Sequence, residues 1–308
     1  MDAIPAARHA VAMIEVTDLS KRYGSQLAVD GVSFRCEPGT ITGFLGPNGA
    51  GKSTTLRMIC GLTPPTTGTT SVLDTSYRKL PNPGREVGVL LDASAQHAGR
   101  SGREVLRLTA DVLGVDRARV PELLGRVGLP ANAAKKRVGN YSLGMRQRLG
   151  IAQALLGEPR VLILDEPANG LDPEGIFWMR ELLRDFADRA GTVLLSSHLL
   201  REVEVIADQL IVIGDGKIVA QGSKAELLSA SGTFVRTRDP EVLYDGLVAA
   251  GIGATQSPDG TLVADAEPEA VGVIAAELGC ALIELRPADG GGLEQLFLTL
   301  TAREEVAA

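Results

Sequence analysis

The sequence predicts an α/β protein with a mostly parallel sheet in a large first domain and a separate core in a smaller second one. Short, almost wholly apolar runs at 41–45, 161–164 and 192–197 alternate with helical patterns, as the buried strands of parallel sheets do. Two helical patterns between 102 and 127 form an insert. After the small-residue stretch at 229–232, the predicted order strand–helix–strand–strand–helix–strand–helix indicates a second α/β core.

These patterns also set the expected domain boundaries. We expect a flexible tail at 1–12, because this Ala-rich stretch lacks the positive start and apolar core of a signal peptide. The first domain is expected at 13–230, with a helical subdomain at about 93–158. The remainder, 231–308, is expected to be a small accessory domain without site chemistry.

Periodicity predicts the individual strands and helices. The remaining predicted strands are 13–17, 29–34, 87–91, 210–213, 217–220, 233–237, 281–285 and two that flank 258–260. The predicted helices are 54–60, 102–113, 117–127, 146–156, 174–189, 240–250, 267–278 and 293–300, with a short one starting at 222–226. The Pro- and Thr-rich stretch at 63–68 is expected to be a loop.

The composition is that of a globular protein, with 44% hydrophobic and 22% charged residues in 308. The net charge of −7 disfavours a protein that coats nucleic acid, so we expect no nucleic-acid partner. Cys36, Cys60 and Cys280 form no C-x-x-C pair and are expected to be buried thiols. No stretch of about 18 apolar residues encodes a transmembrane helix, so work at a membrane would require a partner that spans it.

The loop at 46–54 matches the phosphate-binding pattern G-x-x-x-x-G-K-[ST] between a predicted strand and a predicted helix. Its glycines let backbone N–H groups turn toward phosphate oxygens, and the helix N-terminus adds its positive dipole end. Lys52 is placed to neutralise the β- and γ-phosphates, and Ser53 to ligate Mg²⁺. The alternative is an ordinary glycine-rich turn. The predicted phosphate-binding residues are Gly46, Pro47, Asn48, Gly49, Ala50, Gly51, Lys52, Ser53 and Thr54.

Two acids, Asp165 and Glu166, end the apolar run at 161–164. Ligands of open α/β sheets bind beyond the carboxyl ends of the strands. Asp165 is therefore a candidate for holding Mg²⁺ through water, and Glu166 for polarising an attacking water. The alternative is a pair of helix N-caps, since Pro167 follows. His198 ends the next such strand and can reach the same edge, although a lone histidine is usually an ordinary polar residue.

Tyr23 lies between the first two predicted strands, upstream of the loop, and its ring could stack on a nucleobase. The alternative is an ordinary half-buried tyrosine. Ser142 is a good N-cap for the helix that follows, and Gly144 leaves backbone N–H groups uncovered near its start. On the local residues alone, a plain helix N-cap is enough to explain Ser142 and Gly144.

Taken together, these motifs resemble the nucleotide-binding subunit of ABC transporters over about residues 13–230. The resemblance implies a P-loop NTPase fold, an ABC ATP-binding domain with a helical subdomain, in which Tyr23 stacks on the base of ATP. It makes 46–54 the Walker A motif, 164–166 the end of Walker B, and 170–172, with Asp172, the D-loop. It also makes His198 the switch histidine and Glu166 the residue that activates water for hydrolysis.

The stretch 141–145 occupies the position of the family's signature motif. It departs from the common form Leu-Ser-Gly-Gly-Gln at its first, third and fifth residues. The resemblance implies a head-to-tail homodimer in which the signature of one chain completes the ATP site of the other, with Mg²⁺ accompanying ATP. The residues expected to reach the opposite ATP site are Ser142, Leu143, Gly144 and Met145.

One departure concerns the glutamine that the family places after the strand at 87–91. Here Asp92 stands at that position, and Gln96 follows later. A carboxylate can ligate Mg²⁺, so Asp92 is a candidate metal ligand beside Ser53 and Asp165. The variant signature, the Asp92 loop and the C-terminal extension look like the drug- and antibiotic-export branch. That branch implies an ABC-2-type permease partner and a place at the cytoplasmic face of the membrane.

Two other functions remain open from the sequence. One is a soluble, non-transport ABC ATPase, although the long coiled coils and second cassettes of such proteins are missing here. The other is export of polysaccharide or lipid, with the C-terminal domain reading the ligand. A sugar reader would show exposed aromatic rings, and 233–308 contains only Phe234, Tyr244 and Phe297.

Overall fold

The computed structural model describes residues 12–228, 232–257, 261–264 and 266–287. The chain divides into two compact units between Gly222 and Ser223, earlier than the boundary expected at residue 230. The expected tail at 1–12 lies almost wholly outside the described residues, and the helix expected at 293–300 lies entirely outside them. No helix among the described residues is long and apolar enough to cross a membrane.

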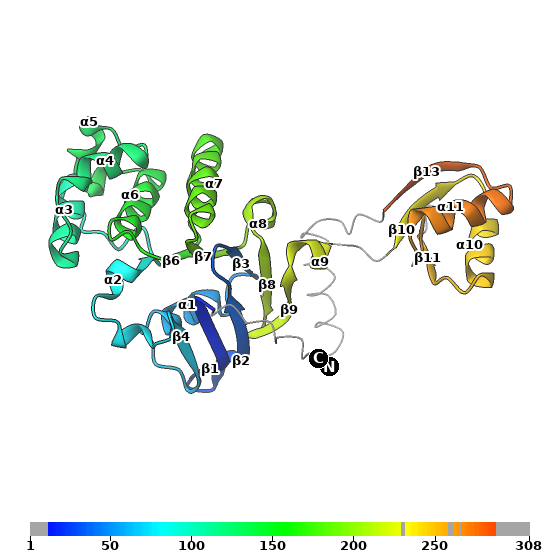
Figure 1. Ribbon diagram of the computed structural model, residues 1–308, viewed down its shortest axis with the longest axis horizontal. Coiled ribbons are helices and arrows are strands. Elements are labelled where there is room, and N and C mark those ends of the chain that lie inside the picture. Colours follow the sequence, from blue (N-terminus) through cyan, green and yellow to red (C-terminus); the bar gives the residue numbers. More distant parts are fainter. Residues whose placement is uncertain (1–11, 229–231, 258–260, 265, 288–308) are drawn as a thin grey trace, which may run out of the picture. The chain divides into compact units, whose positions relative to one another are not determined.

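The first unit is built on a six-stranded sheet with the order β5-β6-β7-β3-β8-β9 (Figure 1). Its strands are β3 (Ile41–Leu45), β5 (Val87–Leu90), β6 (Val161–Asp165), β7 (Thr192–Ser197), β8 (Gln209–Gly214) and β9 (Lys217–Ser223). The pairs from β5 to β8 are parallel, with Leu45 opposite Ser197 and Asp165 opposite Ser196. The last residues of β3, β6 and β7 therefore meet at one edge, where the sequence predicts the site.

A three-stranded antiparallel sheet, in the order β2-β1-β4, packs beside the parallel one. It consists of β1 (Ile14–Tyr23), β2 (Gln26–Cys36) and β4 (Thr67–Val72). Strand β4 extends into the predicted loop at 63–68, because its threonines pair with β1 and threonine suits a strand. Tyr23 and Gln26 face each other across the β1–β2 turn.

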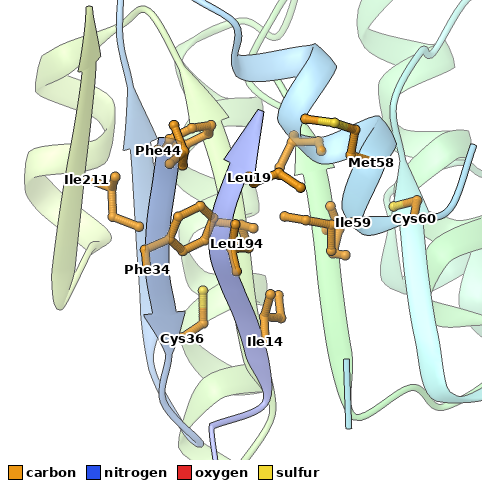
Figure 2. Close-up of a cluster of buried hydrophobic side chains, with 14 of the residues drawn as sticks. Ile14, Leu19, Phe34, Cys36, Phe44, Met58, Ile59, Cys60, Leu194 and Ile211 are labelled. Carbon is orange, nitrogen blue, oxygen red and sulfur yellow. The ribbon is translucent and has the colours of Figure 1, made fainter. Parts of the chain in front are cut away.

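The core lies between the two sheets and α1 (Lys52–Ile59), as Figure 2 shows. Ile14, Leu19 and Phe34 from the antiparallel sheet meet Phe44 and Leu194 from the parallel one. The rings of Phe34 and Phe44 lie 5.6 Å apart. Cys36, Cys60 and Cys280 are buried free thiols, which confirms the prediction for all three.

Strand β3 carries a large side chain on one face and a glycine on the other. Phe44 points into this core, whereas a Cβ on Gly43, on the other face, would lie 2.2 Å from the side chain of Val203. Only glycine therefore lets α8 (Leu200–Ile206), a helix that the sequence did not predict, pack on β3.

The helical part of the first unit is inserted between β5 and β6. Its helices are α3 (Gly102–Leu113), α4 (Arg119–Arg126), α5 (Ala131–Ala134) and α6 (Leu143–Leu155). The first unit also contains α2 (Pro83–Glu86), α7 (Pro173–Asp188) and the 3₁₀ turns Tyr77–Lys79 and Val138–Asn140, whereas α9 (Lys224–Leu228) belongs to the second unit. Trp178 of α7 connects to the insert, because its indole N–H donates to the Arg126 carbonyl at 3.0 Å and the Arg148 guanidinium lies 4.3 Å from its ring.

The second unit is a βαββαβ fold with a four-stranded antiparallel sheet in the order β11-β12-β10-β13. Its strands are β10 (Thr233–Thr237), β11 (Ala254–Gln256), β12 (Leu262–Ala264) and β13 (Leu282–Pro287), and its helices are α10 (Pro240–Ala249) and α11 (Pro268–Glu277). Val235, Leu243, Leu247 and Leu262 form a core of its own.

Candidate functional site

The loop at 46–54 joins β3 to α1 and holds its shape through glycine. Gly49 and Gly51 have φ of 89° and 102°, which side-chain-bearing residues rarely adopt. A Cβ on Gly51 would also lie 2.5 Å from the Ala28 carbonyl oxygen. Gly51 is the N-cap of α1 and supplies no side-chain cap, so the first N–H groups of the helix are left for an anion.

Lys52 lies inside the loop, with 5% of its surface exposed. Its ammonium donates to the carbonyl oxygens of Gly46 at 2.7 Å and Pro47 at 3.1 Å. It also lies 3.6 Å from Glu166 Oε1. The structure thus brings the predicted phosphate-binding lysine beside the predicted catalytic carboxylate.

Glu166 follows β6 and meets His198, which follows β7. His198 Nδ1 lies 2.8 Å from Glu166 Oε2, and the tautomer decides which atom donates. The backbone N–H of His198 approaches the same oxygen at 3.4 Å. Both side chains remain partly exposed, at 20% for Glu166 and 38% for His198, so water can reach them.

Asp165 is buried at the end of β6, and Ser196 of β7 orients it. The Ser196 hydroxyl donates to Asp165 Oδ1 and accepts the Glu166 N–H at 3.0 Å. Sequence reasoning missed Ser196. The available signal was a serine near the end of an apolar strand, at the position that pairs with the acid.

Tyr23, Glu166 and the loop line one pocket of about 340 Å³. Tyr23 is 49% exposed, and the Lys21 ammonium lies 5.0 Å from its ring centre. Gln26 lines the same pocket beside Tyr23 and was not singled out in the sequence. The loop residues that line it are Asn48, Gly49, Gly51, Lys52, Ser53 and Thr54. Gly46, Pro47 and Ala50 are not among the lining residues.

The signature stretch does not line this pocket. Ser142 caps α6 by accepting the Met145 N–H at 3.2 Å, and Asp172 caps α7 by accepting the Gly175 N–H at 2.8 Å. The two loops touch, because a Cβ on Gly144 would lie 2.7 Å from the Gly170 carbonyl oxygen. Leu143 is 49% exposed. Ser142, Leu143, Gly144 and Met145 thus lie apart from their own chain's phosphate pocket.

Asp92 is also apart from the pocket. It lines a second cavity of about 400 Å³, together with Gln96 and His97. Its Oδ1 accepts from the Ser94 backbone N–H at 2.7 Å and from the Ser94 hydroxyl at 2.6 Å. The structure therefore does not bring Asp92 together with Ser53 and Asp165.

Two of the predicted metal ligands supply oxygen donors that suit a hard cation, and of these Ser53 lines the pocket whereas Asp165 does not. The Ser53 hydroxyl is exposed on the first turn of α1, and Asp165 supplies an oriented carboxylate. Across the described ranges, no group of three or more His, Cys, Asp or Glu residues could hold a metal by itself. A cation that takes few protein ligands and shares phosphate oxygens fits this set.

Comparisons with known proteins agree with this geometry. A family model described as ABC transporter matches residues 29–169, and one described as a domain of unknown function matches 231–293. The chain is 43% identical over 212 residues to the bacitracin transport ATP-binding protein BcrA of Bacillus licheniformis. This alignment covers 68% of this chain and 69% of that protein.

A second relative matches nearly the whole chain. The Nod factor export ATP-binding protein I of Burkholderia pseudomallei is 36% identical over 304 residues, covering 96% of this chain and 98% of that protein. A solved structure of an ATP-binding subunit of an ABC transporter has a TM-score of 0.64 and 31% identity, covering 70% of this chain and 91% of that one.

Proposed function

The chain belongs to the ATP-binding subunits of ABC transporters and is an ATP hydrolase, and we propose that it powers the export of a drug or antibiotic through a separate membrane permease. The name of the bacitracin transport relative supports this cargo class. The permease that we propose is of the ABC-2 type. It would hold the chain at the cytoplasmic face of the membrane.

The observation that carries the proposal is that Lys52 and Glu166 line one pocket and lie 3.6 Å apart, while His198 contacts Glu166 at 2.8 Å. The loop amides and Lys52 would bind the β- and γ-phosphates, and the Tyr23 ring would stack on the base. Glu166 would accept a proton from the attacking water, while His198 orients the Glu166 carboxylate. Mg²⁺, held by Ser53 and Asp165 with ATP, would supply positive charge to the phosphate oxygens.

A second copy of the chain is part of the proposal. The N-terminus of α6 lies outside its own pocket, which supports a role for the loop at 142–145 at the pocket of another chain. A homodimer with twofold symmetry provides two such completed sites from one set of motifs. Each ATP would then lie between the Walker A loop of one chain and the signature of the other.

Replacing Glu166 by glutamine tests the catalytic assignment. We expect Glu166→Gln to lower kcat for ATP hydrolysis by about 100-fold or more, because an amide cannot accept the proton from water. ATP binding is expected to persist, since Lys52 and the loop are unchanged. Glu122→Gln, an exposed change on α4, is the control and should hydrolyse ATP normally. Undiminished hydrolysis by Glu166→Gln would remove the assignment.

The export role is tested by purifying the tagged chain from membranes. We expect it to co-purify with a polytopic permease, whose presence stimulates ATP hydrolysis. Recovery without any membrane-spanning partner would contradict export and favour a soluble ABC ATPase. Stimulation by a polysaccharide- or lipid-exporting permease would contradict the drug cargo.

A further inference from the structure

Glu166 has an unusual backbone conformation. Its φ is 49°, in the left-handed region that residues with a side chain seldom occupy. Such a conformation persists only where the surrounding groups hold it, and it is often found at functional sites. The direction of the Glu166 side chain, toward Lys52 and His198, depends on this backbone geometry.

Three groups hold the Glu166 peptide. Its N–H donates to Ser196 Oγ at 3.0 Å, and its carbonyl oxygen accepts the Asn169 N–H at 3.1 Å. The same oxygen accepts Nε2 of Gln147 at 3.2 Å. Ser196 lies in β7 and Asn169 follows β6 by four residues, whereas Gln147 comes from α6 in the helical insert.

Packing alone does not account for a glutamine at this position. Gln147 is 4% exposed, and its Oε1 is buried with no hydrogen-bond partner in the described part of the chain. A buried polar atom without a partner costs stability. An apolar side chain of the same length would avoid that cost. The Glu166 carbonyl oxygen accepts the Asn169 N–H with one lone pair and the Gln147 amide N–H with the other, and the second bond fixes the amide with Nε2 toward Glu166.

We propose that Gln147 is a positioning residue for ATP hydrolysis, which holds the Glu166 backbone so that the carboxylate faces the phosphate pocket. The inference rests on the proposed function of Glu166. It also extends that function, because Gln147 lies one turn along the helix that Ser142 begins. Engagement of the partner's ATP by the start of α6 would be transmitted through Gln147 to Glu166 of the same chain. The two ATP sites of the dimer would thereby be coupled.

The test compares Gln147→Met with Gln153→Met in the full-length chain. Methionine keeps the length of the side chain and removes the donor. We expect Gln147→Met to lower kcat by about ten-fold through misplacement of the carboxylate, with KM for ATP unchanged and the melting temperature not lowered. Gln153 lies on the same helix and donates to Thr109 Oγ1 at 3.1 Å. Gln153→Met should leave kcat unchanged.

A double variant separates this inference from the function on which it rests. If Gln147 acts through Glu166, Gln147→Met should cause no further loss in single-turnover hydrolysis when Glu166→Gln is already present. The inference would be overturned if kcat were normal in both Gln147→Met and Gln147→Leu, or if their only effect were on KM for ATP. It would also be overturned if Gln147→Met slowed hydrolysis by the same factor in the Glu166→Gln background as in the native chain. Normal hydrolysis by Glu166→Gln would overturn the catalytic role of Glu166 and the inference together.

Discussion

Asp92 shows how the nearest partner of a side chain decides what that side chain can do. The hydroxyl of Ser94 and then its backbone N–H lower the pKa of Asp92, and the charge of Arg57 acts in the same direction. The carboxylate is ionised and engaged in its own turn. Its Oδ1 accepts two hydrogen bonds from Ser94, and the cavity that the side chain lines includes neither Ser53 nor Asp165.

Removing the Ser94 hydroxyl should return the pKa of Asp92 toward its ordinary value of 3.8. We expect Ser94→Ala to raise this pKa and Ser94→Thr, which keeps the hydroxyl, to leave it low. Because the folded-state pKa is depressed, the stabilisation is present above 3.8 and is lost as pH falls through the folded value. Carboxyl chemical shifts of Asp92 measured against pH check this. Equal titration curves for Ser94→Ala and the native chain would contradict it.

The contact between strand β5 and helix α6 depends on two glycines, one on each element. A Cβ on Gly88 would lie 2.2 Å from the backbone carbonyl oxygen of Ala154, which cannot move without shifting the helix. Gly150 makes a similar approach from α6, where a Cβ would lie 2.5 Å from the side chain of Leu90. The close contact brings α6, and with it Gln147, against the sheet.

Two alanine substitutions should therefore have opposite effects on stability. We expect Gly88→Ala to lower the free energy of unfolding by at least about 2 kcal/mol through overpacking. Gly125 lies within α4, and a Cβ there would meet nothing within 4 Å. Gly125→Ala should raise the free energy by roughly 0.5–1 kcal/mol. Denaturant titrations followed by circular dichroism measure both, and a Gly88→Ala chain as stable as Gly125→Ala would contradict the packing.

Local patterns explain most of the elements that the sequence predicted. The apolar runs of β3 and β7 have the same bounds as predicted, and the helix predicted at 102–113 is α3. Strand β4 and helix α8 were missed, because pairing with β1 and packing on Gly43 form them, and neither is visible in a local pattern.

The site divides in the same way. The loop at 46–54 and the acids after β6 are contiguous, so the sequence located them. Ser196 and Gln147 contact Glu166 across 30 and 19 residues of chain. No local pattern connects them, since the fold alone makes them neighbours. The position of the Asp92 carboxylate could not be predicted, because it depends on the hydrogen bond that the Ser94 hydroxyl donates to it.

Two of the hydrophobic cores among the described residues, one in each unit, share no residue. One joins β1, β2 and α1 to the parallel sheet, and the other lies within the βαββαβ unit. A unit with its own core is expected to unfold by itself. The alignment with the Nod factor export relative spans both units, whereas that with the bacitracin transport relative spans 68% of the chain.

A substitution in the second core tests this independence. Leu247 is fully buried, and we expect Leu247→Ala to destabilise the second unit by roughly 2–5 kcal/mol. Hydrogen exchange should then accelerate in α10 and β10 but stay unchanged in β3 and β6. Val248→Ala, at a position 52% exposed, is the control. Faster exchange throughout the first unit would show that the two cores unfold together.

Trp178 has a practical consequence of a different kind. It is the single tryptophan of the chain, and it belongs to α7 while its ring and indole N–H contact the helical insert. Any rotation of the insert against α7 must change the surroundings of this one indole. The protein thus carries an intrinsic fluorophore where α7 meets the helical insert, and any such rotation can be followed by emission without attaching a dye.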